Sequence, residues 1–200
     1  KILGRPKQLP FNSGSGRLML YKNGFISIHH SAKICGELGR LELNKKWNTN
    51  DPFQSLLVLK RDANLLVNGH FSIYSGSKLY INEGANLILG SGYINHNLSL
   101  SCFSRIEIGN DVAISENVCI RDSDNHQLIH IDTTPDKPST SPVKIGDHVW
   151  IGMNAVILKG VSIGNGAIIA ANAVVIRDIP SNSLAAGCPA AIISKQVTWK

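Results

Sequence analysis

The feature that most constrains this chain is a six-residue repeat of aliphatic residues. Six consecutive hexads begin with an aliphatic side chain, at Ile145, Ile151, Ile157, Ile163, Ile169 and Val175. The same spacing recurs at positions 108, 114 and 120, and more loosely at 67, 73 and 79. A period of six fits neither a helix of 3.6 residues per turn nor a plain hairpin sheet. It predicts short strands separated by corners, with the aliphatic residues facing inward.

Three hexads make one triangular coil of 18 residues, and Ile163 repeats Ile145 at that interval. Stacked coils pair as parallel strands about 4.8 Å apart, and each coil buries its apolar residues only against its neighbours. Buried strands of an ordinary sandwich do not account for six unbroken hexads. We therefore predict an all-β chain folded as a parallel β-helix. The expected corner residues are Gly109, Gly146, Gly152, Gly164, Asn110, Asn154, Asn165 and Asn172.

We expect residues 1–200 to form a single domain. Residues 1–60 are expected to give irregular N-terminal coils and a loop at 44–54, residues 61–180 the β-helix, and residues 181–200 a short C-terminal cap. One long excursion interrupts the repeat at about 123–142, because the interval from Ile120 to Ile145 far exceeds the single hexad that would continue it. Pro135, Pro138 and Pro142 keep this segment out of the sheets. A long loop in a regular solenoid indicates function.

Composition and charge narrow the classes of partner. The chain has 18 Asn and 18 Gly but only 5 Glu among its 14 acidic residues, which disfavours a helical fold. A net charge of +6 favours a polyanionic partner, but the basic residues form no stripe interleaved with aromatic residues, so nucleic acid is not expected. Four widely spaced cysteines indicate a reducing compartment, and with no secretory signal or transmembrane segment in view we expect a cytoplasmic protein.

Several motifs together resemble a known family. They are KIGDHVWIG at 144–152, AAGCPA at 185–190, YINHNL at 93–98, which matches a YxNxNL element, and a loop histidine at 126. These residues resemble the hexapeptide-repeat acyltransferases, above all the galactoside and maltose acetyltransferase type of sugar and polysaccharide O-acetyltransferases. The resemblance covers roughly residues 87–193. It implies a left-handed β-helix and a homotrimer with active sites between neighbouring subunits.

The resemblance also implies a reaction, the transfer of an acetyl group from acetyl-CoA to a hydroxyl of a sugar or surface polysaccharide. Such a direct transfer needs a base for the acceptor hydroxyl, and His126 matches the histidine that the family uses. It would deprotonate the acceptor and then protonate the departing thiolate. Asn95 matches the asparagine that hydrogen-bonds the acceptor. From residue type alone, the alternative interpretation of His126 is a solvated loop residue, and that of Asn95 is a coil corner.

Further residues are assigned to the cofactor by the same resemblance. Trp150 would line the thioester end of the channel, and the backbone near Gly152, Ala170 and Ala171 would meet the pantetheine arm. Both assignments compete with wall packing and with the need for small corner residues. Arg177, Lys159 and Lys195 are candidates for the phosphates of coenzyme A. No metal is expected.

Departures from the family leave alternatives open. The asparagine-proline-alanine-lysine ending of many relatives is replaced here by residues 188–191, Cys-Pro-Ala-Ala. The segment 1–60 lacks the helical cap of the galactoside and maltose enzymes, which favours the surface-polysaccharide branch. The main alternative is a nucleotide-sugar N-acetyltransferase. A zinc enzyme like the γ-type carbonic anhydrases would need His96, His126 and His130 to converge, and a non-catalytic β-helix module is the fourth hypothesis.

Overall fold

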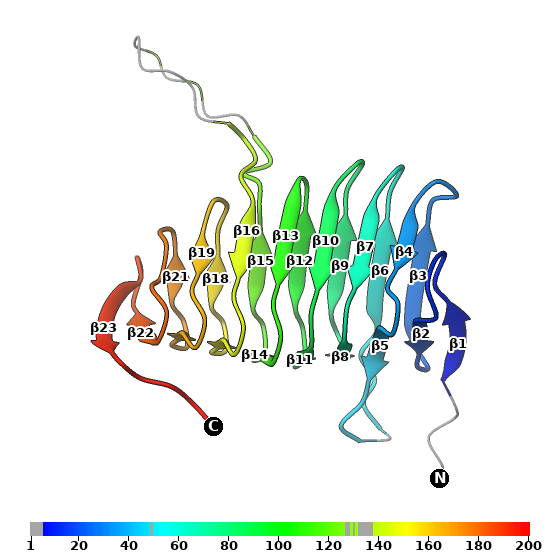
Figure 1. Cartoon of the computed structure of the whole chain (residues 1–200), viewed down its shortest axis with the longest axis horizontal. Coiled ribbons are helices and arrows are strands. Elements are labelled where there is room, and N and C mark those ends of the chain that lie inside the picture. Colours follow the sequence, from blue (N-terminus) through cyan, green and yellow to red (C-terminus); the bar gives the residue numbers. More distant parts are fainter. Residues whose placement is uncertain (1–5, 49, 127–128, 130, 132–137) are drawn as a thin grey trace.

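The computed structural model describes residues 6–48, 50–126, 129, 131 and 138–200, and these contain 23 strands and no α-helix. No helix that could cross a membrane occurs among these described residues. Three sheets wind around one core as a left-handed parallel β-helix, so the predicted fold class is confirmed (Figure 1). The chain passes from sheet 1 to sheet 2 to sheet 3 in each coil. His130 lies outside the described residues.

Sheet 1 contains β1 (Lys7–Pro10), β2 (Arg17–Leu20), β5 (Arg40–Lys45), β8 (His70–Tyr74), β11 (Gly92–Ile94), β14 (Val112–Ile114), β17 (Trp150–Ile151), β20 (Ile168–Ile169), β22 (Ser183–Ala186) and β23 (Ala191–Lys195). Sheet 2 contains β3 (Gly24–Ile28), β6 (Ser55–Leu59), β9 (Lys78–Ile81), β12 (Ser99–Cys102), β15 (Cys119–Arg121), β18 (Val156–Ile157) and β21 (Val174–Val175). Sheet 3 contains β4 (Lys33–Cys35), β7 (Asn64–Val67), β10 (Asn86–Leu89), β13 (Arg105–Ile108), β16 (Val143–Ile145) and β19 (Ser162–Ile163). The coils thus already begin at β2.

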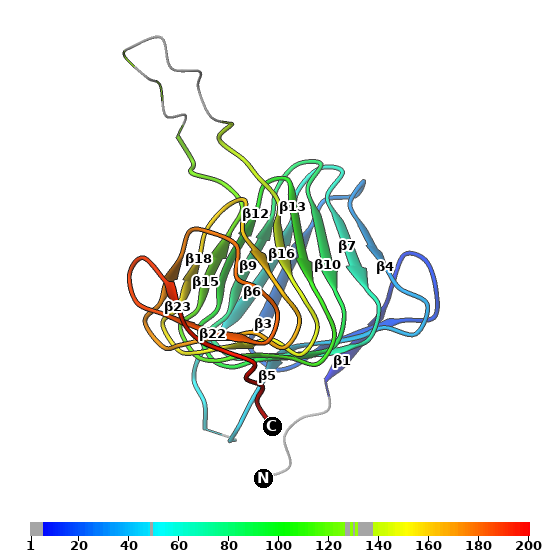
Figure 2. The same cartoon turned by 60° about the vertical axis from the view of Figure 1, so that its left-hand side comes forward.

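The core is a set of aliphatic stacks that run along the axis of the helix, enclosed by the three sheets whose arrangement Figure 2 shows. In sheet 1 the register places one inward residue of each coil over the next, in the order Leu43, Ile73, Ile94, Ile114, Ile151, Ile169 and Ala185. All seven are fully buried. The six hexad positions from 145 to 175 are buried as well, which confirms that they face inward. Each inward residue packs mainly on the equivalent residues of the neighbouring coils. The whole hydrophobic core therefore lies within the repeat.

Coils shorten toward the C-terminus. In sheet 2 Leu57 pairs with Leu79, and Leu100 pairs with Ile120. Ile157 pairs with Val175, and this interval equals three hexads, shorter than either of the two before it. The hexads are regular only where the coil has three equal sides of one hexad each. The looser spacing upstream therefore reflects longer sides rather than a different fold.

The corners use glycine and asparagine for different reasons. Asn97, Asn117, Asn154 and Asn172 occupy equivalent places in successive coils and all have positive φ, between 58° and 63°. Gly152 is not in that conformation; it is buried, and a side-chain carbon there would lie 2.6 Å from the backbone nitrogen of Ala171 in the next coil. The asparagines turn the chain, whereas this glycine lets two coils approach.

The expected excursion leaves between β15 and β16, at the edge where sheets 2 and 3 meet (Figure 1). Its two described arms pair through an antiparallel bridge between Ser123 and Thr140. Below them the carboxylate of Asp122, fully buried, accepts hydrogen bonds from the backbone N–H groups of residues 103, 104 and 105 at 2.7–2.8 Å. Asp122 thus holds the corner of the preceding coil directly beneath the foot of the excursion.

The C-terminal cap consists of β22 and the antiparallel β23, and the tail behind them returns to the edge between sheets 3 and 1. The Trp199 ring stacks on His148 with centroids 4.4 Å apart, and its Nε1 donates to the His148 carbonyl oxygen at 2.8 Å. Nδ1 of His148 lies 2.6 Å from Asp111 Oδ2, and Nε2 lies 3.1 Å from the Trp199 carbonyl oxygen. The hydrogen bond to Asp111 raises the pKa of His148.

We expect Asp122→Ala to lower the free energy of unfolding by about 3 kcal/mol, because three backbone donors lose a charged acceptor. Asp122→Asn keeps one acceptor oxygen and is expected to lose less. Urea unfolding followed by circular dichroism measures both. Equal stability of Asp122→Ala and wild type would contradict the role given to this carboxylate.

The tail contact is expected to weaken as pH rises. Only the protonated His148 ring donates to both Asp111 and Trp199, so the contact is complete at low pH and is lost as pH passes the raised pKa of the folded state. NMR titration of the Trp199 indole proton measures this. Asp111→Asn should lower the midpoint, and the exposed Asp62→Asn serves as a control. A Trp199 indole chemical shift that stays constant while His148 titrates would refute this account.

Candidate functional site

One edge of the β-helix, where sheet 1 turns into sheet 2, gathers most of the predicted site residues. Asn95, Ser115, Gly152 and Ala170 follow one another there in successive coils. Their backbone N–H groups each bond a carbonyl of the next coil at 2.7–2.9 Å. Ala171 lies beside Ala170 and is exposed. The structure therefore brings Asn95, Gly152, Ala170 and Ala171 onto a single line, which we call the sheet 1–sheet 2 edge.

Asn95 has an unusual polar environment on this edge. Its Nδ2 donates to Glu116 Oε1 at 3.3 Å, which fixes the orientation of the amide, because a carboxylate can only accept. Its Oδ1 is buried and, within the described part of the chain, has no hydrogen-bond partner. A buried acceptor without a donor costs stability and requires an explanation. A donor hydroxyl from a bound ligand would satisfy it.

Trp150 lies next to this line, on the outer face of sheet 1. The register places it beside Ala113 of β14, which in turn lies beside Tyr93 of β11. Its ring is 42% exposed, and Nε1 donates to Ser115 Oγ at 3.4 Å, a long hydrogen bond. The Trp199 ring of the tail approaches to 6.4 Å between centroids. Trp150 therefore presents an aromatic surface toward the sheet 1–sheet 2 edge.

His126 does not join these residues within one chain. It is an exposed residue on the outgoing arm of the excursion, which starts at the sheet 2–sheet 3 edge. Asn95 lies at the other end of sheet 2. The whole width of that sheet separates the two edges, and in Figures 1 and 2 the described arms lead away from sheet 1.

The three predicted basic residues also lie away from Asn95. Lys159 follows β18 at the sheet 2–sheet 3 edge; its Nζ lies 2.5 Å from Asp124 Oδ2 and donates to the Pro138 carbonyl oxygen at 2.6 Å. It thus ties both arms of the excursion together, a role that the sequence did not indicate. Arg177 follows β21 at the same edge and is exposed, and Lys195 is exposed in β23.

Sequence reasoning missed a cluster at the N-terminal part of the same edge. Asp51, in the loop between β5 and β6, accepts a hydrogen bond from the buried Ser75 hydroxyl. Ser75 Oγ also lies 2.8 Å from Nδ1 of His96, the neighbour of Asn95. Because the serine proton goes to Asp51, His96 Nδ1 must donate to Ser75 Oγ, and in the neutral imidazole Nε2 is then the acceptor. His96 lies in the YINHNL motif, but Asp51 and Ser75 are far from that motif in sequence, so the motif did not reveal the cluster.

A second polar cluster lies on the outer face of sheet 1. Burial raises the pKa of Glu42, but hydrogen bonds from Lys45 and Ser72 outweigh it and lower that pKa to about 2. The distances from Glu42 are 2.7 Å to Lys45 Nζ and 2.8 Å to Ser72 Oγ. The carboxylate therefore stays ionised and holds Lys45 in place.

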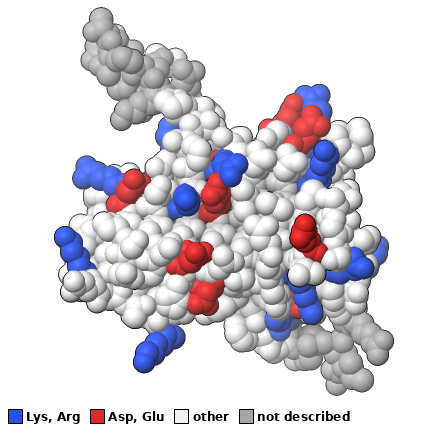
Figure 3. Space-filling model, in the orientation of Figure 1, with Lys and Arg blue, Asp and Glu red and all other residues white. Residues whose placement is uncertain are grey.

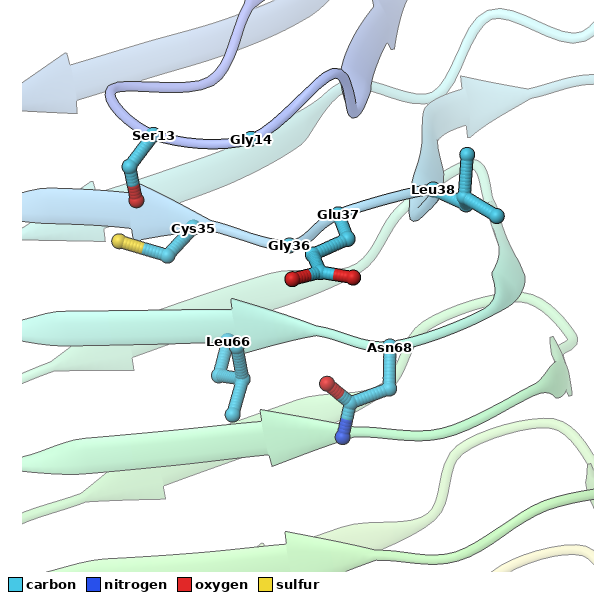
Figure 4. Close-up of a pocket in the computed structure, with 8 residues that line it drawn as sticks. All are labelled: Ser13, Gly14, Cys35, Gly36, Glu37, Leu38, Leu66 and Asn68. Carbon is cyan, nitrogen blue, oxygen red and sulfur yellow. The ribbon is translucent and has the colours of Figure 1, made fainter.

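An open hollow on the N-terminal coils is separate from this edge (Figure 4). It is lined by residues of sheet 3 and of the loop before β2, among them Ser13, Cys35, Glu37 and Asn68. None of the predicted site residues lines it.

Comparison with known proteins identifies the repeat and the proteins that share it. The bacterial transferase hexapeptide family (six repeats) matches residues 142–177. A putative acetyltransferase of Saccharomyces cerevisiae is 41% identical over 117 residues, 58% of this chain and 59% of that protein. The galactoside O-acetyltransferase of Escherichia coli is 35% identical over 116 residues, 58% of this chain and 57% of that protein. The matches thus span less than two thirds of either relative.

A solved structure shows the same fold over most of the chain. The crystal structure of the polySia-specific acetyltransferase NeuO superimposes with a TM-score of 0.54 at 22% identity, covering 92% of this chain and 82% of the other. Residues 142–177 therefore carry the repeat of the bacterial transferase hexapeptide family, and the chain resembles the sugar O-acetyltransferases built on that repeat.

Proposed function

We propose that the chain is an acetyl-CoA-dependent O-acetyltransferase whose acceptor is a hydroxyl of a sugar or surface polysaccharide. The observation that carries the proposal is the buried Oδ1 of Asn95, which has no hydrogen-bond partner among the described residues, on an edge that the exposed Trp150 flanks. An acceptor hydroxyl supplies the donor that this oxygen lacks. The similarity to a galactoside O-acetyltransferase supports a sugar hydroxyl as the acceptor.

In this mechanism His126 is the general base. It removes the proton of the acceptor hydroxyl while the hydroxyl oxygen attacks the carbonyl carbon of the thioester. The tetrahedral intermediate collapses with cleavage of the carbon–sulfur bond, and the imidazolium returns its proton to the thiolate. Asn95 Oδ1 orients the acceptor by accepting from its hydroxyl before that proton leaves.

The residues of the edge are compatible with a long, narrow acyl carrier. Ala170 and Ala171 offer little side chain, so a pantetheine arm can approach the backbone, and Trp150 is exposed beside them. Gly152 is buried and already required by the spacing of the coils. Lys159 is already paired with Asp124, which leaves Arg177 and Lys195 as the remaining basic candidates for phosphate. On the face drawn in Figure 3, acidic and basic residues are interspersed.

We further propose that the active enzyme is a homotrimer with each site between two neighbours. His126 and Asn95 lie on different edges of one chain, so a second copy must supply one of them. A cyclic assembly repeats that pairing with every copy equivalent. The reaction is assigned to the cytoplasm, because all four cysteines are free thiols, which a reducing compartment maintains.

Replacing His126 with Ala should lower kcat for acetyl transfer by about 10²–10⁴-fold, the usual contribution of a general base. Thiol release from acetyl-CoA with a galactoside and a panel of oligosaccharides as acceptors measures it. The exposed loop position should leave the circular dichroism spectrum and the thermal midpoint unchanged. A folded variant with wild-type transfer would overturn the assignment of the base.

Mixing two inactive variants tests the shared site. His126→Ala and Asn95→Ala, co-expressed with different tags, should form mixed trimers that each contain one intact site. Random assembly then restores about a quarter of wild-type activity. A site built within one chain would instead give only the average of the two parents. Sequential purification on the two tags checks that mixed trimers form.

A further inference from the structure

An aromatic pair occupies the N-terminal part of the sheet 1–sheet 2 edge. Trp47, in the loop between β5 and β6, stacks on Tyr74 at the end of β8, with ring centroids 4.4 Å apart and planes 9° from parallel. Tyr74 is buried, whereas Trp47 is 60% exposed. The pair therefore forms a flat aromatic surface open to solvent.

The structure holds this surface in place. Lys45 Nζ lies 5.6 Å from the centroid of the Tyr74 ring and is itself fixed by Glu42. The loop is held by Asp51, whose Oδ1 accepts from the backbone N–H of Phe53 at 3.0 Å and whose Oδ2 accepts from the Ser75 hydroxyl. A ligand that stacks on Trp47 would lose little entropy in ordering it, because the ring is already positioned.

The aromatic surface lies on the same line as Asn95. The Tyr74 ring is 6.3 Å from that of His96, the residue after Asn95. Lys45, two residues before Trp47, pairs in register with Tyr74. The loop therefore leaves the helix two coils before Asn95. Two coils span about 10 Å at the usual strand spacing. Ala170 and Ala171 lie on the opposite side of Asn95. The edge thus runs from the expected cofactor contacts through Asn95 to Trp47.

We propose that Trp47, stacked on Tyr74, forms a second sugar subsite that binds another residue of an extended glycan acceptor. A pyranose ring presents an apolar C–H face that packs on an aromatic ring, and a hydroxyl rim that can donate to the acceptor Nε2 of His96. The loop that carries Trp47 leaves the helix two coils before Asn95, so we infer that a second sugar, beyond the one at Asn95, reaches Trp47 and that the subsite selects acceptors of two or more sugars. The proposal rests on the proposed function, because Asn95 defines where the reacting sugar lies.

Binding is tested first, without turnover. A glycan array of neutral, amino and acidic mono- to hexasaccharides is probed with coenzyme A present. The proteins applied are wild type, Trp47→Ala, Trp47→Phe and Phe25→Ala. Phe25 is 50% exposed on sheet 2 and serves as the matched control. We expect wild type and Phe25→Ala to bind a set of oligosaccharides, Trp47→Ala to bind them about tenfold more weakly, and Trp47→Phe to keep most of the affinity.

Kinetics then separate this subsite from the catalytic proposal. With the best-bound oligosaccharide as acceptor, Trp47→Ala should raise KM about tenfold with kcat unchanged, whereas kcat/KM for its monosaccharide unit should stay at the wild-type value. His126→Ala should lower kcat by about 10²–10⁴-fold and leave glycan binding intact, so failure of the mechanism and failure of the subsite are distinguishable. The proposal is overturned if wild type binds no oligosaccharide, or if Trp47→Ala lowers kcat/KM equally for mono- and oligosaccharide acceptors. It is also overturned if Trp47→Ala changes the mass of the oligomer.

Discussion

Backbone hydrogen bonding between successive coils is the constraint on which the rest of this structure depends. It sets a spacing of about 4.8 Å, and every inward side chain must then pack on the equivalent residue of the next coil. The fully buried stack from Leu43 to Ala185 shows the result in sheet 1. The same spacing excludes a side chain at Gly152. The spacing between coils therefore requires both the aliphatic residues inside and the small residues at such corners.

A helix of this kind leaves only its edges and outer faces for chemistry. Inward positions are committed to the core, so polar groups concentrate where the chain turns. On the sheet 1–sheet 2 edge the structure places the Asp51–Ser75–His96 cluster and the amide oxygen of Asn95, which has no hydrogen-bond partner within the described part of the chain. The tryptophan at position 150 lies beside them on the outer face of sheet 1. The sheet 2–sheet 3 edge carries the excursion, tied by Lys159 and supported by Asp122. The separation of these two edges is the physical basis for our proposal that the site is shared between copies.

The sequence predicted the solenoid, the excursion and the cap because each depends on local spacing. A hexad is visible in any stretch of the chain, and an insertion is visible as a break in it. The upstream coils look irregular in the sequence because their sides are longer, and the three-hexad repeat fails where Leu57 pairs with Leu79. For the site, motif resemblance singled out His126, Asn95 and Trp150 without showing how they lie relative to one another.

By itself the sequence determined the fold class and the residue types that line the core, because both follow from the period of six. Only the tertiary structure decided which residues share an edge. Trp47 and Tyr74 are far apart in sequence yet their rings stack, and Trp199 reaches His148 from the far end of the chain. Lys159 proved to be a tie for the excursion rather than a free cation. Such contacts depend on coil length and loop path, which no local pattern encodes.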